Sequence, residues 1–258
     1  MGIYRRSLFG GLFLLICSVT VFAEKGALTV AAAANLATTI PEINAAFEKS
    51  HPGVRVQTTI GSSGALTAQI LNGAPFDVFL SADMRFPEQI YLRGGAVEPP
   101  ELYALGKLVL VSRVRYSPET VEDFLVNSEG PVVIPNPRVA PYGSAALEFL
   151  KTAGIYDLVQ TRIAYTENIP QTVRMVLATD GLGFISKSAF LSLNKKEKKS
   201  SPYIWFEIDP ETYKPIRQGG IITLYGKNNP WARKYLDFLI LGEGRRFLRA
   251  NGYHVEAD

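Results

Sequence analysis

The chain of 258 residues contains one cysteine, Cys17, and two histidines, His51 and His254. Cys17 lies in an apolar N-terminal run, so a mature chain without this run has no disulfide, no thiol nucleophile and no thiolate metal site. The histidines do not have the spacing of metal ligands. We therefore expect the protein to be stabilised by an ordinary apolar core, for which its length is ample.

An excess of one charge is also missing. The chain has 27 Lys and Arg against 24 Asp and Glu, and without Arg5 and Arg6 the net charge falls to +1. This balance argues against a nucleic-acid-binding protein, which would show a strong basic excess. The one basic run, Lys195–Lys199, lies in a polar stretch and is interpreted as a solvated loop.

Long apolar runs occur only at the N-terminus. Leu8–Val21 follows Arg5 and Arg6, and Val21-Phe22-Ala23 forms a small-residue cleavage site. This is the layout of a secretory signal peptide, and the run is short for a bilayer-spanning helix of about 20 residues. We predict a signal peptide over residues 1–23, cleaved after Ala23, and a soluble periplasmic protein.

Two alternatives use the same apolar run. The run could stay uncleaved as an N-terminal anchor, or Cys17 could become a lipid-modified first residue. Ile16 is bulkier than the small residue that such lipid processing usually tolerates, which disfavours the second alternative.

Catalytic motifs are incomplete. Gly61-Ser62-Ser63-Gly64 follows a predicted strand and starts a predicted helix, but a nucleophile elbow has the form G-x-S-x-G. No general base for a serine is evident, and the chain has no G-x-x-x-x-G-K-[ST] phosphate loop. We therefore expect no enzyme, although a hydrolase that uses Ser63 stays as an alternative.

Short β-branched runs alternate with amphipathic helical runs, which predicts an α/β fold with mostly parallel sheets flanked by helices. Strands are predicted over residues 27–31, 54–60, 76–80, 107–112, 132–135, 163–165, 183–185 and 220–225. Helices are predicted over residues 38–49, 63–71, 144–152, 170–178, 230–241 and 245–251.

We interpret this pattern as two lobes. Lobe I comprises residues 24–106 plus 222–258, and lobe II comprises residues 107–221. Because the chain then crosses twice between the lobes, the crossings would form a hinge that closes a cleft around a ligand. A single domain is the alternative, since length alone does not fix the number of domains.

Small or polar residues precede a predicted helix at four strand-to-helix junctions: Ala32–Asn35, Gly61–Gly64, Ala140–Ser144 and Glu167–Pro170. Each could be an ordinary helix cap or turn. However, helix N-termini offer free N–H groups and a positive dipole end, which together suit an anion. Such junctions lie where open α/β sheets bind ligands. The four together predict a small-anion-binding protein.

The motifs at these junctions resemble those of the periplasmic molybdate/tungstate-binding proteins of ABC importers, over essentially the whole mature chain. The most specific is Gly73–Asp83, which matches the pattern G-A-P-x-D-[VL]-F-[IL]-S-A-D. Further matches occur at Thr29–Leu36, Gly61–Leu66, Asn136–Gly143, Glu167–Ile169 and Leu182–Ile185. The resemblance implies a two-lobed type II periplasmic binding-protein fold, molybdate or tungstate as ligand, no cofactor, a membrane permease as partner, and a monomer.

The same resemblance implies a set of ligand-binding residues, namely Asn35, Ser62 or Ser63, Tyr142 and the backbone N–H of Ile169, with Ser186 as a weaker candidate. Ser186 stands where some members have a tyrosine. Members with asparagine at the first junction can supply a tyrosine from the third, and Tyr142 fits that version.

The donor types of these residues indicate the kind of anion. A fully ionised tetrahedral oxyanion presents only acceptors, so hydroxyl, amide and backbone N–H donors suit it. A protonated anion such as phosphate would also need an acceptor, and Glu167, the nearest carboxylate, is expected to face away. We therefore favour a dianion, and molybdate, tungstate and sulfate remain open because sequence does not fix pocket size.

Overall fold

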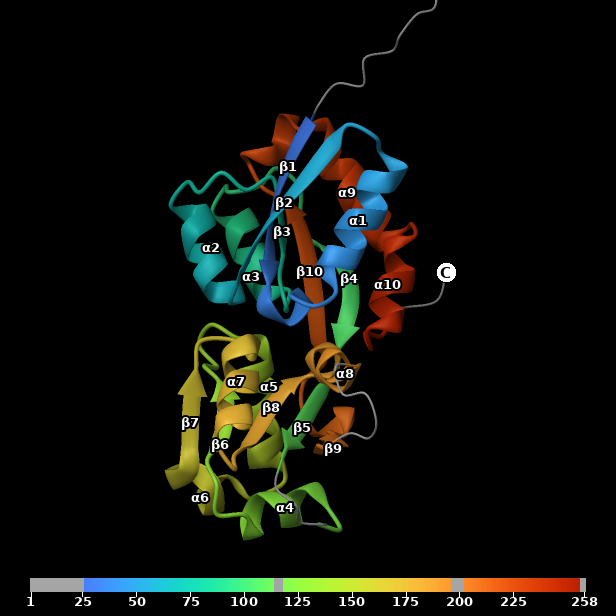
Figure 1. The fold of residues 1–258 in the computed structure, drawn as a ribbon. Coiled ribbons are helices and arrows are strands. Elements are labelled where there is room, and N and C mark those ends of the chain that lie inside the picture. The colour runs from blue at the N-terminus through green and yellow to red at the C-terminus, as the bar shows by residue number, and fades with distance from the viewer. Residues whose placement is uncertain (1–25, 114–117, 196–201, 256–258) are drawn as a thin grey trace, which may run out of the picture.

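The computed structural model describes residues 26–113, 118–195 and 202–255, and it places two five-stranded sheets end to end in two lobes (Figure 1). The predicted signal peptide and the basic run beyond Lys195 lie outside the described residues. Within the described ranges, no helix is both long and apolar enough to cross a membrane.

The sheet of the first lobe has the order β2-β1-β3-β10-β4. Its strands are β1 (Gly26–Ala33), β2 (Val54–Gly61), β3 (Val78–Leu80), β4 (Glu101–Gly106) and β10 (Ile216–Ile222). It is flanked by α1 (Ile40–Ser50), α2 (Ser63–Leu71), α3 (Arg85–Leu92), α9 (Pro230–Ile240) and α10 (Gly244–Ala250), with short 3-10 turns η1 (Ala34–Leu36) and η4 (Gly226–Asn228).

Helices cover both faces of this sheet because successive side chains of a strand point to opposite faces. Val30 and Ala32 belong to an apolar cluster with Phe47 of α1, whereas Ala31 belongs to a separate cluster with Leu66 of α2. β1 is therefore buried on both faces at its carboxyl end, as its apolar sequence predicts.

The second lobe repeats this plan with the strand order β7-β6-β8-β5-β9. Its strands are β5 (Leu108–Ser112), β6 (Val132–Pro135), β7 (Ile163–Thr166), β8 (Leu182–Ser186) and β9 (Ile204–Glu207). Its helices are α4 (Val121–Asn127), α5 (Pro141–Thr152), α6 (Tyr156–Val159), α7 (Ile169–Ala178) and α8 (Lys187–Lys195), with η2 (Gln160–Arg162) and η3 (Pro210–Thr212).

Both sheets are mixed, because one strand in each runs against its neighbours. β10 is antiparallel to β3 and β4, and β5 is antiparallel to β8 and β9, while the remaining pairs are parallel. These reversed strands are the ones by which the chain enters the second lobe and returns to the first (Figure 1). The predicted two-lobed α/β architecture is confirmed.

The return strand begins earlier than predicted. β10 pairs with β4 from Ile216 onward, with Ile216 opposite Gly106 and Gln218 opposite Ala104. The first sheet thus includes residues 216–221, which the predicted division gives to lobe II. Arg217 and Gln218 interrupt the apolar run, so the pattern predicted a strand only from residue 220. The division into lobes at 106/107 and 221/222 stays a prediction.

Candidate functional site

Four junctions between strands and helices meet in one small cavity between the lobes. The cavity has a volume of about 20 Å³, close to the space that one or two water molecules need. Its lining consists of Ala33, Ala34, Asn35, Ser62, Ser63, Ala82, Ala140, Pro141, Tyr142, Asn168 and Ile169. The structure therefore brings together all the predicted site residues except Ser186.

Asn35 lies in η1, directly after β1, and is buried. Its Nδ2 donates to Gln218 Oε1 at 2.9 Å and to Tyr253 OH at 3.0 Å, so both amide hydrogens are engaged within the protein. The donor that remains for a ligand is the backbone N–H, because the first N–H groups of a helical turn have no partner within it. Asn35 Oδ1 is buried without a partner among the described residues.

Ser63 is the first residue of α2, and Ser62 precedes it as the N-cap. Ser63 Oγ accepts a hydrogen bond from the backbone N–H of Ala82 at 3.0 Å, which leaves its hydroxyl proton free to donate. Ser62 makes no side-chain capping bond. Both serines line the cavity, so the choice between them as ligand contacts stays open.

Tyr142 is the second residue of α5 and is 2% exposed. Its hydroxyl accepts a hydrogen bond from Gln218 Nε2 at 3.3 Å. Burial, together with the neighbouring Tyr253 and Tyr213, raises the pKa of Tyr142 well above 10, although hydrogen bonds with Gln218 and Asn35 oppose this shift. The hydroxyl therefore keeps its proton at neutral pH and can act as a donor.

Ile169 is the first residue of α7, and Pro170 after it has no N–H. The side chain of Asn168 caps this helix, because its Oδ1 accepts from the Gln171 N–H at 3.1 Å. The backbone N–H of Ile169 is thus the first N–H at this helix end. Glu167 is exposed and accepts a hydrogen bond from Gln171, so it does not enter the cavity lining.

Ser186 ends β8 and is buried, but it is not among the residues that line the cavity. Its Oγ lies 2.9 Å from Ser188 Oγ and accepts from the Ala189 N–H at 3.2 Å. Ser188 Oγ in turn donates to the backbone carbonyl of Asn35 at 2.9 Å. The structure thus places Ser186 behind the site, in a chain of hydroxyls that joins α8 to the first lobe.

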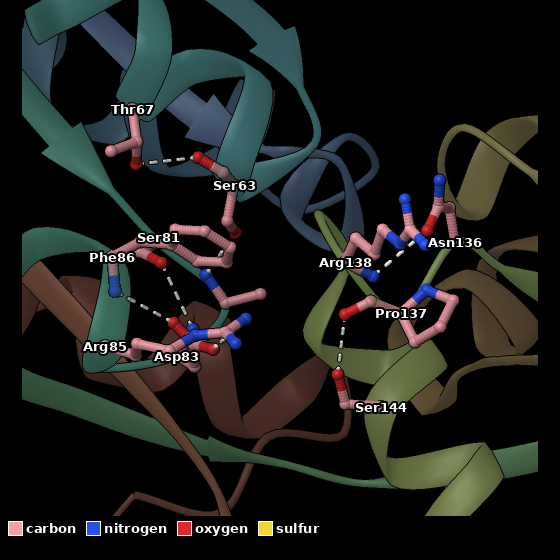
Figure 2. Close-up of polar contacts among 11 residues, drawn as sticks. Ser63, Thr67, Ser81, Asp83, Arg85, Phe86, Asn136, Pro137, Arg138 and Ser144 are labelled. Carbon is pink, nitrogen blue, oxygen red and sulfur yellow. Dashed lines mark hydrogen bonds and ion pairs between the residues drawn. The ribbon is translucent and has the colours of Figure 1, made fainter.

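Figure 2 shows the two walls of the cleft, with Ser63 and Asp83 on one side and the loop before α5 on the other. Two side-chain bonds help to hold this loop: the Arg138 N–H donates to Asn136 Oδ1 at 3.0 Å, and Ser144 Oγ donates to the Pro137 carbonyl at 2.8 Å. These bonds fix the path of the chain into α5 and hence the position of Tyr142.

Charged side chains lie outside the cavity. Among the described residues that line it, none is Lys, Arg, His, Asp or Glu. A larger groove of about 640 Å³ beside it contains Asp83, Arg85 and Lys151, and shares Pro141 with the cavity. Burial raises the pKa of Asp83, although the Phe86 N–H and Arg85 oppose this shift. The cavity itself offers uncharged donors and helix N-termini, an arrangement that suits an anion.

A catalytic or metal site has no support in this arrangement. The described residues contain no cluster of three or more His, Cys, Asp or Glu side chains that could hold a metal ion. No described residue that lines the cavity is a histidine or carboxylate able to act as a base for Ser63. The geometry favours binding over turnover.

Sequence reasoning missed two side chains behind the cavity, Gln218 and Tyr253. Gln218 is fully buried, and its Oε1 also accepts from Tyr103 OH at 2.8 Å. Tyr253 OH lies 2.9 Å from the Asn35 carbonyl, to which it donates. The only local feature that pointed to Gln218 was a polar residue next to an apolar run. Tyr253 left no such feature in the sequence, because it lies 218 positions after Asn35.

The chain is similar to proteins of one family along nearly its whole length. The sequence profile of the bacterial extracellular solute-binding protein family matches residues 28–254. The molybdate-binding proteins ModA of Azotobacter vinelandii and Rhodobacter capsulatus are each 34% identical to the chain, over 95% and 94% of both sequences respectively.

Solved structures agree in fold. The periplasmic molybdate-binding protein of Azotobacter vinelandii matches with a TM-score of 0.78 at 29% identity, and the match covers 89% of this chain and 100% of that one. The sulfate-binding protein SubI of Mycobacterium tuberculosis has a TM-score of 0.71 at 13% identity, over 88% and 86% of the two chains, which shows a shared fold only. These matches confirm the predicted fold and the non-enzymatic class. The chain belongs to the bacterial extracellular solute-binding proteins, as a member of the ModA family.

Proposed function

We propose that this protein binds molybdate or tungstate in the cavity between its lobes and delivers it to an ABC importer. The observation that carries the proposal is the convergence of the starts of α2, α5 and α7 on a small cavity with an uncharged lining. The molybdate-binding names of its relatives support the choice of ligand.

The proposed contacts are donors from both lobes. Ser63 and Tyr142 would each donate a hydroxyl proton, since the oxygen of each already accepts a hydrogen bond from the protein. Asn35 and Ile169 would contribute backbone N–H groups, with Ser62 as a further hydroxyl donor. The helix ends would offset the charge of a dianion without a buried lysine or arginine.

The cellular setting is part of the proposal. The chain would be exported, cleaved after Ala23, and work as a monomer that docks on the membrane permease of the importer. Membership of an extracellular solute-binding family supports export, and the layout of residues 1–23 supports the cleavage site. The balanced charge gives no support for a nucleic-acid partner.

One observation favours a second candidate ligand. The unpartnered Oδ1 of Asn35 is an acceptor in a residue that lines the cavity. An acceptor in the site suits a protonated oxyanion such as hydrogen phosphate, which can donate its proton, whereas molybdate, tungstate and sulfate carry no proton to donate at neutral pH. Phosphate therefore joins sulfate, which the sequence left open, as a competing ligand to test.

The test is calorimetry of protein isolated from the periplasm of an expressing bacterium, titrated with molybdate, tungstate, sulfate and phosphate in one buffer. We expect tight binding of the first two and much weaker binding of sulfate and phosphate. Equal binding of sulfate, or preferential binding of phosphate, would overturn the assigned specificity. The mass of the isolated protein would show whether cleavage follows Ala23.

Single substitutions test the assigned contacts. Ser63→Ala and Tyr142→Phe each remove one donor to a charged ligand, at a cost on the order of 1.5–3 kcal/mol, or roughly 10- to 150-fold in Kd. Tyr165→Phe is the matched control, because Tyr165 is 53% exposed and lies outside the cavity lining. Unchanged affinity in both site variants would place the ligand elsewhere.

A further inference from the structure

Gln218 of β10 joins the two lobes directly behind the cavity, although it is not among the residues that line it. Its side chain is fully buried and both ends of its amide are engaged. Oε1 accepts from Asn35 Nδ2 at 2.9 Å and from Tyr103 OH at 2.8 Å. Nε2 donates to Tyr142 OH at 3.3 Å, across the cleft.

The orientation of this amide decides what Tyr142 can offer a ligand. A tyrosine hydroxyl has a single proton and can also accept. Because Nε2 donates to the hydroxyl oxygen, the proton of Tyr142 is not used by Gln218. If the amide were reversed, Oε1 would face Tyr142 and take that proton. Asn35 Nδ2 donates to Oε1 and holds the amide in the first orientation. Tyr103 OH also lies at donating distance from Oε1, but its single proton is shared with the Ser81 carbonyl at 2.9 Å, so it adds less to this preference.

The backbone at the first crossing between the lobes is shaped around this pair. Gly106 ends β4, opposite Ile216 of β10. A Cβ at Gly106 would lie 2.3 Å from Tyr142 OH and 2.7 Å from Gln218 Nε2, far inside the ordinary contact distance of about 3.5 Å. The bond between Gln218 and Tyr142 therefore lies against the strands that connect the two lobes.

We infer that Gln218 is a positioning residue of the anion site: it holds Asn35 and directs the hydroxyl proton of Tyr142 to the ligand, and it ties both to the returning hinge strand. This inference rests on the proposed function, since the ligand is the oxyanion of that proposal. It explains why a polar side chain is buried in a strand that could otherwise be apolar.

The first test is a double-mutant cycle between Gln218→Met and Tyr142→Phe, read by calorimetry with molybdate. Met keeps the length of the side chain but neither donates through nitrogen nor accepts strongly. We expect Gln218→Met to weaken binding about tenfold, and Tyr142→Phe to cost several-fold less in that background than in the wild type, because the hydroxyl is no longer directed. Additive losses would overturn the inference.

The second test uses Gln218→Glu, whose carboxylate accepts at both oxygens and would take the proton of Tyr142. A carboxyl group at this buried position has a raised pKa. Its protonated form can donate to Tyr142 as Nε2 does. We therefore expect molybdate affinity to recover severalfold as pH falls from about 8 to 5, relative to the wild type at each pH. A flat ratio would overturn the inference.

These outcomes separate the two proposals. Failure of the wild type to bind any of the four oxyanions would overturn the proposed function and this inference with it. Binding by the wild type, with additive losses and a flat pH ratio in the variants, would overturn the inference alone. Should Gln218→Met fail to fold, the pH ratio of Gln218→Glu is compared with that of the double variant Gln218→Glu/Tyr142→Phe, because an ionised carboxylate also repels the dianion by charge. Equal ratios in the two variants would overturn the inference.

Discussion

A glycine at the start of α2, Gly64, contacts the second lobe directly. Gly64 N–H donates to the carbonyl of Val139 at 3.0 Å, a backbone bond between α2 in the first lobe and the loop before α5 in the second. A Cβ at Gly64 would lie 2.9 Å from Val139 Cγ1 and 3.0 Å from its Cα and Cβ. Since carbon atoms pack at about 3.5–4.0 Å, Gly64→Ala must separate the two segments by roughly half an ångström or more.

Two effects of this substitution have opposite signs. Alanine favours a helix by about 1 kcal/mol over glycine, so α2 itself should not be weakened. Separation of the walls breaks the bond to Val139, worth about 0.5–1.5 kcal/mol, and moves the donors of Ser63 away from those of Tyr142 and Ile169. With about 1 kcal/mol for the displaced ligand donors, the summed loss of binding free energy is on the order of 1.5–2.5 kcal/mol, or roughly 10- to 100-fold in Kd.

The assay pairs molybdate calorimetry with thermal unfolding of the ligand-free protein. Gly64→Ala should bind 10- to 100-fold more weakly, with an unfolding temperature no lower than that of the wild type. Ala68→Gly is the matched control, because Ala68 is exposed on the same helix: its unfolding temperature should fall while its affinity stays unchanged. Wild-type affinity in Gly64→Ala would refute the role of this contact in closure.

Two further outcomes follow from buried hydroxyl groups in and behind the site. Ser188→Ala removes the bond to the Asn35 carbonyl and should weaken molybdate binding by about two- to tenfold, whereas Ser192→Ala on the same helix should leave the titration unchanged. Burial raises the pKa of Tyr142 well above 10 and that of Tyr253 to about 12. Above pH 10 the unfolded chain therefore loses protons that the folded chain keeps, and stability should fall by up to about 1.4 kcal/mol per pH unit per group. Denaturant titrations with equal midpoints at pH 9 and 11.5 would contradict this.

The sequence predicted the junctions because their signals are local. Helix caps, turns and strand ends are each written in a few neighbouring residues, and Ser63–Leu71 forms α2 over the predicted span. The cavity lining follows from these junctions once the sheets form, because the carboxyl ends of parallel strands lie at one edge.

The side chains behind the cavity could not be predicted from local sequence patterns. The polar residues Arg217 and Gln218 concealed the start of β10 in the sequence. The role of Gln218 also depends on its hydrogen bond with Asn35, which lies 183 positions away. α3 was missed as well, since Pro87 and its charged neighbours obscure the apolar face formed by Phe86 and Ile90. Such contacts are set by tertiary packing, for which hydrophobic periodicity carries no signal.

The uncharged lining has a consequence for how the ligand would leave. Tyr142 is the only titratable side chain among the described residues that line the cavity, and its pKa lies well above 10. A shift toward acid within the physiological range therefore adds no proton to the lining and cannot expel an anion by changing its charge. On the proposed function, release would instead require separation of the lobes at the two crossing strands, which would give a docked transporter control over the moment of unloading.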